Sequence, residues 1–414
     1  MASAALPSVL PMVERRAAAA NAVLRALLYL TVASFPFEMP DLHLRWQAPQ
    51  LTSSLFLVGT MLQPMTCYRR MPVAIWAFVA FLFAFGLSVA RHEPIDAMDV
   101  AQDFVLVVQG IMIFWAASNL LQEERVARGA LWAMAVGAFV WAMLPMLGLG
   151  RTEDVVWTGG TRITAFGQNA NRAAVLISAG MLALFSLTHG RIAKPGLARL
   201  LVWPVLALMA VAVEDTGSRG GLLALIGGLL VFLVLNRAKT LGGRLRVVLI
   251  GAFAIGALAY TASQTEVMRN RLEDTAETGT MAGREDLYPA LWDMFLERPI
   301  TGWGPDNNQY EVTIRAPMMD KIKRDAHNLV LELLTSTGIV GAIPFLAGLA
   351  WCIAAAWRAR QGPHGVVPLA LLTTFLIANM SGNHLAFKPF WFSLAFAVAA
   401  AAVTVRPPAS ETAR

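Results

Sequence analysis

The sequence predicts an all-α integral membrane protein with about twelve transmembrane helices and one large polar loop. Hydrophobic residues make up 57% of the 414-residue chain and charged residues only 14%, and the mean hydropathy is +0.57. Soluble domains carry roughly 25% charged residues. The apolar residues form repeated runs of about 17 to 22, the length a helix needs to cross a bilayer. A β-barrel would instead show alternating segments of about ten residues.

Short polar or basic segments separate the apolar runs, so each run can be assigned in turn. We expect one transmembrane domain over residues 1–414, with tight turns or short loops between most spans. The expected spans lie near residues 19–37, 51–66, 72–90, 103–121, 129–149, 171–188, 200–213, 221–235, 247–262, 338–357, 366–380 and 389–405. A turn-rich loop, residues 151–171, joins the fifth span to the sixth and is expected on the membrane surface or folded back into it.

Most basic clusters fall on one face of this arrangement. A net charge of +6 on one soluble face would suggest nucleic acid, but clusters between spans are typical of membrane topology, so we predict no nucleic-acid partner. By the positive-inside rule this face, with both termini, is cytoplasmic. The clusters are Arg15–Arg16, Arg69–Arg70, Arg125/Arg128, Arg191/Lys194/Arg199, Arg237 to Arg246 and Arg358/Arg360.

The long loop between the ninth and tenth spans, residues 263–326, is therefore expected outside the cytoplasm. It is the one long polar segment of the chain, and we expect amphipathic helices in it. Leu287, Leu291 and Met294 recur at helical spacing, which predicts a helix over residues 284–298 that Pro299 ends.

A second helix is expected to begin near Asp325, which can serve as its N-cap, and to place His327 and Asn328 in its first turn. A helix N-terminus disfavours protonation of a nearby imidazole, and a general base must be neutral at neutral pH. His327 is thus a candidate catalytic residue, with Asp325 and Asn328 in support. A histidine at a membrane interface can equally hydrogen-bond a carbonyl or a headgroup, and the sequence leaves this alternative open.

Five basic residues map to the extracytoplasmic side, at or just beyond span ends. An unpaired cation costs about 2.5 to 3.5 kcal/mol at the bilayer centre, so such residues tend to be paired or functional. Guanidinium groups bind phosphate oxygens through two parallel hydrogen bonds. Singly, each residue is explained by a headgroup or an ion pair, whereas their convergence would suit a phosphate-bearing lipid. The five are Arg162, Arg172, Arg219, Arg284 and Lys388.

The sequence contains no motif for metal or cofactor chemistry. It has no phosphate-binding P-loop, no His-Glu-x-x-His, no Asp-x-Asp pair and no Gly-x-Ser-x-Gly. The cysteines, Cys67 and Cys352, both fall in or beside predicted spans, which argues against a disulfide framework or a Cys-based zinc site. We therefore predict no metal and no cofactor.

Two stretches resemble the signature of the O-antigen ligase and polymerase superfamily. The first is the eight residues from Arg298 to Pro305, RPITGWGP, and the second is the run from Ala326 to Gly341, which contains AHNLVLELL and TGIVG. The arrangement of twelve spans around one large loop extends the resemblance over nearly the whole chain.

The resemblance implies a metal-independent membrane glycosyltransferase similar to the GT-C type, in the bacterial inner membrane with its active site on the periplasmic side. Such an enzyme moves a glycan from undecaprenyl diphosphate to a sugar hydroxyl of lipid A core, completing lipopolysaccharide with inversion. The family's loop histidine matches His327, its loop arginine matches Arg284, and its arginine between the seventh and eighth spans matches Arg219. One departure is that Leu287 stands three residues after Arg284 and Tyr288 four, where we expect leucine.

Two alternatives remain open at this point. An O-antigen polymerase of the same superfamily would use the same donor with a second diphosphate-linked glycan as acceptor. A twelve-span transporter would show paired repeats and broken helices near the membrane midplane, and no such repeat is evident in the sequence.

Overall fold

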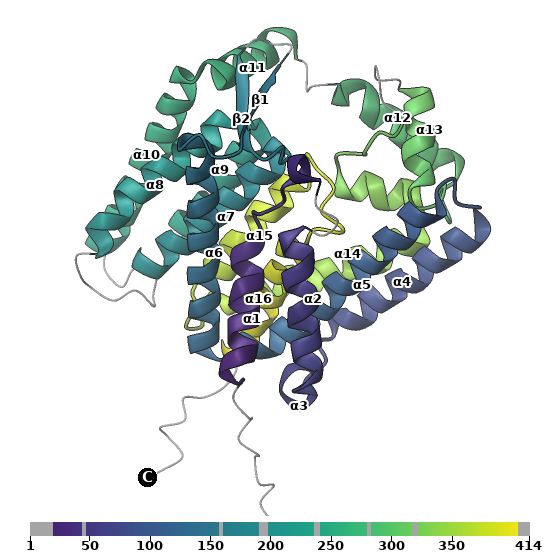
Figure 1. Cartoon of the computed structure of the whole chain (residues 1–414), viewed down its shortest axis with the longest axis horizontal. Coiled ribbons are helices and arrows are strands. Elements are labelled where there is room, and N and C mark those ends of the chain that lie inside the picture. The colour runs from purple at the N-terminus through teal and green to yellow at the C-terminus, as the bar shows by residue number, and fades with distance from the viewer. Residues whose placement is uncertain are drawn as a thin grey trace, which may run out of the picture.

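The chain folds into a bundle of α-helices with its polar elements gathered at one end (Figure 1). This computed structural model describes residues 20–43, 47–156, 160–189, 198–235, 241–279, 283–316 and 322–404. The bundle helices are α1 (Ala22–Ser34), α2 (Ala48–Met61), α4 (Ala74–Arg91), α5 (Ala97–Leu120), α6 (Glu124–Met146), α7 (Ala170–His189), α8 (Ala198–Asp215), α9 (Arg219–Leu235), α10 (Leu241–Gln264), α14 (Leu329–Ala359), α15 (Val367–Ala378) and α16 (Lys388–Thr404).

The remaining elements are short. The turns η1 (Pro40–Leu42) and α3 (Pro64–Cys67) flank α2. The polar end holds β1 (Arg151–Val155), β2 (Thr161–Ala165), α11 (Glu266–Thr278), α12 (Arg284–Glu297) and α13 (Asn307–Arg315), and Figure 1 shows these five elements together at the top of the view.

The helices support the expectation of a multi-pass membrane protein. Each expected span overlaps one bundle helix. Within the described residues, α4, α5, α6, α7 and α14 are long and apolar enough to cross a membrane, and α10 with α11, bent by 94°, gives a sixth candidate. Helices α1, α9, α15 and α16 are apolar but shorter. The number twelve and the orientation stay predictions, and several of the basic residues behind the orientation, such as Arg15 and Arg191, lie outside the described part of the chain.

Aromatic packing holds the centre of the bundle together. The Phe78 ring of α4 lies 5.5 Å from Phe114 of α5, 5.5 Å from Phe345 of α14 and 4.9 Å from Trp391 of α16, in edge-on or tilted arrangements. A Cβ at Gly110 of α5 would meet the Trp391 ring at 2.3 Å. Helices in a membrane associate through such close packing because lipid supplies no hydrophobic driving force.

Two regions of the polar end differ from the sequence prediction. The segment after α6 forms an antiparallel hairpin in which Arg151 pairs with Ala165, so the fold is not purely α-helical; its backbone groups are satisfied by each other. The long loop holds α11 and α13 in addition to the predicted α12. The prediction for α12 is confirmed, with Leu287, Leu291 and Met294 buried.

The helix that follows the loop begins later than the sequence predicts. Asn328, and not Asp325, is its N-cap, because the Asn328 Oδ1 accepts the backbone N–H groups of Val330 at 3.0 Å and Leu331 at 3.2 Å. The Asp325 carboxylate instead accepts the backbone N–H of His327 at 3.0 Å. It therefore caps a tight turn before the helix, which leaves His327 outside α14.

A break in α14 receives the glycine-rich turn of residues 299–304. Gly338 interrupts the helix with φ 62° and ψ −165°, where the sequence predicts one helix to end and the next span to begin. A Cβ at Gly338 would lie 2.2 Å from the Ile300 carbonyl oxygen. Backbone hydrogen bonds then join the two segments: Ile339 N to Pro299 O at 2.9 Å, Trp303 N to Thr335 O at 2.7 Å and Gly304 N to Ser336 O at 3.0 Å.

Alanine at Gly338 is expected to destabilise the protein, because a backbone with φ 62° and ψ −165° is essentially restricted to glycine and costs another residue about 1–3 kcal/mol, and the new methyl group would push the turn away. Gly256→Ala in α10 is the matched control, since a Cβ there meets no atom within 4 Å. Thermal unfolding of both purified variants in detergent should give a lower midpoint for Gly338→Ala alone. Equal midpoints would contradict this account of the break.

Candidate functional site

His327 stands at the entrance to α14 and lines a cavity of about 250 Å³. Its φ of 50° is left-handed, a conformation that the hydrogen bond from its backbone N–H to Asp325 stabilises. The side chain is half-buried, so it is held in place but still accessible. Asn171, Arg172, Ser381 and His384 line the same cavity.

Helix α12 contacts the same region through its first turn. Arg284, the first residue of α12, donates from Nη2 to the Ser381 carbonyl oxygen at 3.0 Å. Tyr288, one turn later, has its hydroxyl 3.1 Å from the His327 carbonyl oxygen and 3.0 Å from that of Met380. The residue that departs from the expected leucine is therefore the one that ties α12 to the histidine.

Two more of the predicted arginines, Arg162 and Arg219, lie beside this cavity. Arg162 of β2 donates from Nη2 to Asn171 Oδ1 at 3.1 Å, and the Ser218 hydroxyl donates to the same oxygen at 2.9 Å. Arg219, the first residue of α9, donates from Nη1 to the Arg271 carbonyl oxygen at 2.9 Å. Asn171 thus links Arg162 and the segment before Arg219 to the wall of the His327 cavity.

A fourth arginine, Arg271 of α11, was not predicted. Burial, together with the positive charges of Arg162, Arg219 and Arg284, lowers its pKa to about 10. These charges act on Arg271 because the guanidinium groups lie near it, and Arg219 donates to the Arg271 carbonyl oxygen. A signal was present in the sequence, because Arg271 follows the buried Val267 by four residues and shares its helix face.

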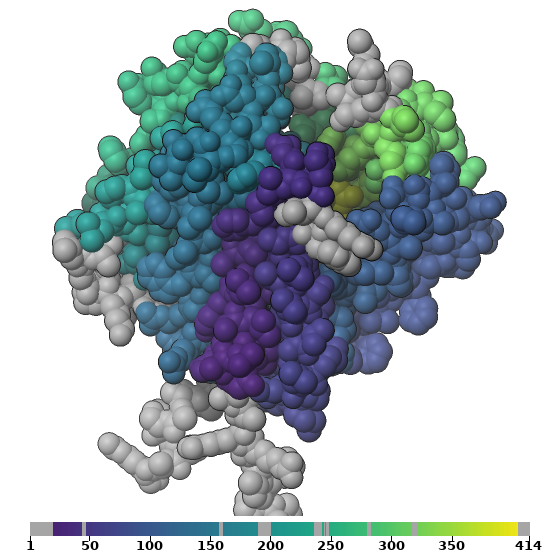
Figure 2. All heavy atoms as spheres, viewed as in Figure 1, coloured from purple at the N-terminus to yellow at the C-terminus, as the bar shows by residue number. Residues whose placement is uncertain are grey.

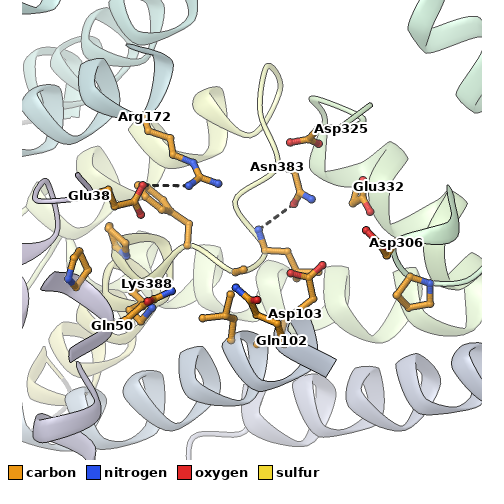
Figure 3. Close-up of a pocket in the computed structure, with 18 of the residues that line it drawn as sticks. Glu38, Gln50, Gln102, Asp103, Arg172, Asp306, Asp325, Glu332, Asn383 and Lys388 are labelled. Atoms are coloured by element: carbon orange, nitrogen blue, oxygen red, sulfur yellow. Dashed lines mark hydrogen bonds and ion pairs between the residues drawn. The ribbon is translucent and has the colours of Figure 1, made fainter. Parts of the chain in front are cut away.

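The other two predicted cations lie at a neighbouring cavity. Arg172 and Lys388 line a second cavity of about 380 Å³, where Arg172 Nη1 pairs with Glu38 Oε2 at 3.2 Å (Figure 3). Arg172 also lines the His327 cavity, as do Asp325 and Asn383. The two cavities therefore share a wall.

Carboxylates line the second cavity together with these cations. Asp103, Asp306, Asp325 and Glu332 all contribute to it. Figure 2 shows a hollow on this face of the molecule, between the purple segment around η1, the blue α5 and the green segment beside α14, with olive C-terminal residues at its floor.

His384 is the other histidine at the His327 cavity. Its Nδ1 lies 3.1 Å from Asn379 Oδ1, and Asn379 Nδ2 donates to the Phe375 carbonyl oxygen, so Nδ1 carries the hydrogen. Burial, followed by the charge of Arg172, lowers the pKa of His384 to about 3. This ring is 4% exposed, which makes it less accessible to a substrate than the ring of His327.

Arg324 is a positioning residue that the sequence analysis did not single out. It is 7% exposed, and it donates from Nη2 to the Gly283 carbonyl oxygen at 2.6 Å and from Nη1 to the Ala316 carbonyl oxygen at 2.7 Å. Gly283 is the N-cap of α12, so Arg324 fixes the end of the helix from which Arg284 extends.

In the described part of the chain, no group of three or more His, Cys, Asp or Glu side chains is placed to hold a metal ion.

Comparison with known proteins adds to this geometry. Residues 204–346 match the family model described as O-Antigen ligase. Over 323 residues the chain is 26% identical to a protein of Pseudomonas aeruginosa named O-antigen ligase, and the match covers 76% of this chain and 74% of that protein. The chain is thus similar to O-antigen ligases over much of its length. The segment matched by the family model contains Arg219, Arg271, Arg284 and His327.

Pyrophosphate is expected to raise the melting midpoint of the purified protein, because a ligand that binds the folded state stabilises it by mass action and the clustered arginines repel one another without an anion. Arg271→Gln should reduce this shift. Arg269→Gln is the matched control, since Arg269 lies two residues earlier in α11 with its side chain 50% exposed, and it should keep the shift. Equal shifts in both variants would contradict the role given to Arg271.

Proposed function

We propose that this protein belongs to the O-antigen ligase family and is a glycosyltransferase that moves O-antigen glycan from undecaprenyl diphosphate to a sugar hydroxyl of lipid A core. The observation that carries the proposal is the convergence of Arg162, Arg219, Arg271 and Arg284 beside the cavity that His327 lines. A diphosphate leaving group needs concentrated positive charge, and a hydroxyl acceptor needs a base. On this proposal the four arginines supply the charge and His327 is the base.

The reaction proposed is a direct displacement at the anomeric carbon. His327 takes the proton of the acceptor hydroxyl as that oxygen attacks, and undecaprenyl diphosphate leaves from the opposite face, which inverts the anomeric configuration. The product is full lipopolysaccharide. Asp325 supports the base by bonding to the His327 backbone N–H, and Asn328 supports it by capping α14 directly behind.

Arginines take the part that a metal ion plays in other transferases. Negative charge grows on the diphosphate as the glycosidic bond breaks, so fixed guanidinium groups stabilise the transition state more than the ground state. Arg219 and Arg284, with Arg271 and Arg162 beside them, are proposed to bind the diphosphate, and Arg172 with Lys388 lies further from this group. No cofactor is required.

The proposed setting is the bacterial inner membrane, with residues 263–326 as a periplasmic loop of one transmembrane domain and both termini in the cytoplasm. Helices α11, α12 and α13 belong to this loop. Both substrates are lipid-anchored, so a site at the membrane surface confines them to two dimensions and raises their effective concentration.

Replacing His327 by Asn should abolish transfer by removing the base, since an amide does not accept a proton at neutral pH. His43→Asn is the matched control: His43 is exposed and also left-handed, with φ 48°, and Asn tolerates that conformation. The assay is lipopolysaccharide formation by purified protein in proteoliposomes. Near-normal transfer by the His327 variant would overturn the assignment of the base.

Arg219→Gln and Arg284→Gln should each raise KM for the diphosphate donor and lower kcat. The reason is that the attraction between each arginine and the diphosphate strengthens as the glycosidic bond breaks. Transfer should persist when divalent cations are chelated with EDTA. Strict dependence on magnesium would count against the arginine account.

The same assay separates ligase from polymerase. Donor supplied with lipid A core should give lipopolysaccharide, whereas donor supplied alone should give no longer glycan. Chain growth without lipid A core would mark the protein as a polymerase of the superfamily.

A further inference from the structure

We infer that the cavity of about 380 Å³ beside the His327 cavity binds the sugar acceptor through a wall of carboxylates that admits hydroxyl donors and excludes phosphate. This inference rests on the proposed function and deepens it, because it assigns the acceptor a site and a chemical class. The carboxylate wall is defined by Asp103, Asp306, Asp325 and Glu332. In Figure 3 these side chains lie to the right of the cavity, and Arg172, Glu38 and Lys388 lie to its left.

Two members of the wall have an oxygen that lacks a protein partner. Glu332 Oε1 accepts from Asn308 Nδ2 at 3.0 Å, and Asp306 Oδ1 accepts from Lys323 Nζ at 2.7 Å. Within the described residues, Glu332 Oε2 and Asp306 Oδ2 are buried and accept no hydrogen bond. Both residues are 4% exposed and both line the cavity.

A buried acceptor without a donor is costly, so these oxygens call for a ligand that donates. A carboxyl oxygen that carries no hydrogen accepts hydrogen bonds. Sugar hydroxyls and ammonium groups can donate to such an oxygen, whereas a phosphate beside this wall brings further acceptors. Gln50, Gln102 and Asn383 add amides that both donate and accept, a combination suited to a polyhydroxylated ligand.

The position of the cavity favours the acceptor over the donor glycan. In an inverting displacement the attacking hydroxyl and the leaving group lie on opposite faces of the sugar. The arginines reach the His327 cavity through Asn171 and Ser381. The carboxylate cavity meets it through Asp325 and Asn383. A hydroxyl extended from the carboxylate cavity therefore reaches His327 on a different side from the diphosphate.

The first test measures transfer kinetics in proteoliposomes, with donor and lipid A core varied separately. Asp103→Asn and Glu332→Gln keep side-chain size and replace one acceptor oxygen by an amide donor, and each should raise KM for the acceptor about tenfold while KM for the donor stays unchanged. Asp293→Asn, which removes an exposed carboxylate of α12, is the matched control and should change neither. A rise in KM for the donor alone, or no change in either KM, would overturn the assignment.

The second test needs no catalysis. Equilibrium binding of lipid-free core oligosaccharide to the full-length protein is compared for a dephosphorylated and a phosphorylated preparation. The wild type should bind the dephosphorylated probe more tightly than the phosphorylated one. The Asp103→Asn variant should show a smaller ratio between the two dissociation constants. Equal binding of both probes by the wild type would overturn the exclusion of phosphate. Binding that follows this pattern in a protein without transfer activity would refute the proposed function and leave the cavity assignment standing.

Discussion

The backbone pairing between the turn of residues 299–304 and the break at Gly338 is the contact on which the site depends. It ties the end of α12 to the middle of α14. Arg284 is the first residue of α12, and His327 directly precedes the N-cap of α14. The Ser88 hydroxyl of α4 donates into the same junction, to Thr301 O at 2.7 Å and Ser336 O at 2.9 Å. A polar loop is thereby fixed to a helix bundle through backbone hydrogen bonds. These bonds require the two backbones to lie close together but require no particular side chain. Glycine is required at the break because any side chain would hold the two segments apart.

Charged groups of both signs surround the site that this junction supports. Arginines from β2, α9, α11 and α12 lie near one another, and carboxylates from α5, α14 and the turns before α13 and α14 line the second cavity together with Arg172 and Lys388. Each set is unfavourable by itself, since like charges repel and burial removes their hydration. A fold that keeps both sets close to one histidine is arranged for two ligands of different charge, which meet where the cavities share Arg172, Asp325 and Asn383.

The sequence predicted the parts of this arrangement that depend on local pattern. Apolar spacing located α12, and Gly338 marked the division of α14, because helical periodicity and glycine conformation are local properties. The predicted start of α14 was wrong because Asp325 and Asn328 are both good N-cap residues, and only tertiary contacts decide between them. The convergence of Arg219, Arg271 and Arg284 was beyond the sequence, since three separate helices contribute them. The hairpin β1–β2 was missed because its strands alternate too weakly to stand out from a turn-rich loop.

The family match covers part of the proposed acceptor cavity, because Asp306, Asp325 and Glu332 lie within residues 204–346. The matched segment, residues 204–346, contains the junction at Gly338, the clustered arginines of α9, α11 and α12, and His327. It omits Gln50, Asp103, Asn383 and Lys388, which line the carboxylate cavity from α2, α5 and the region before and at the start of α16. On the proposed function, leaving-group chemistry would then be common to the family, since every donor carries a diphosphate. The acceptor cavity would combine carboxylates within the matched segment with Gln50, Asp103 and Asn383 outside it. A ligase and a polymerase could share one junction and one base and differ in the cavity that faces them.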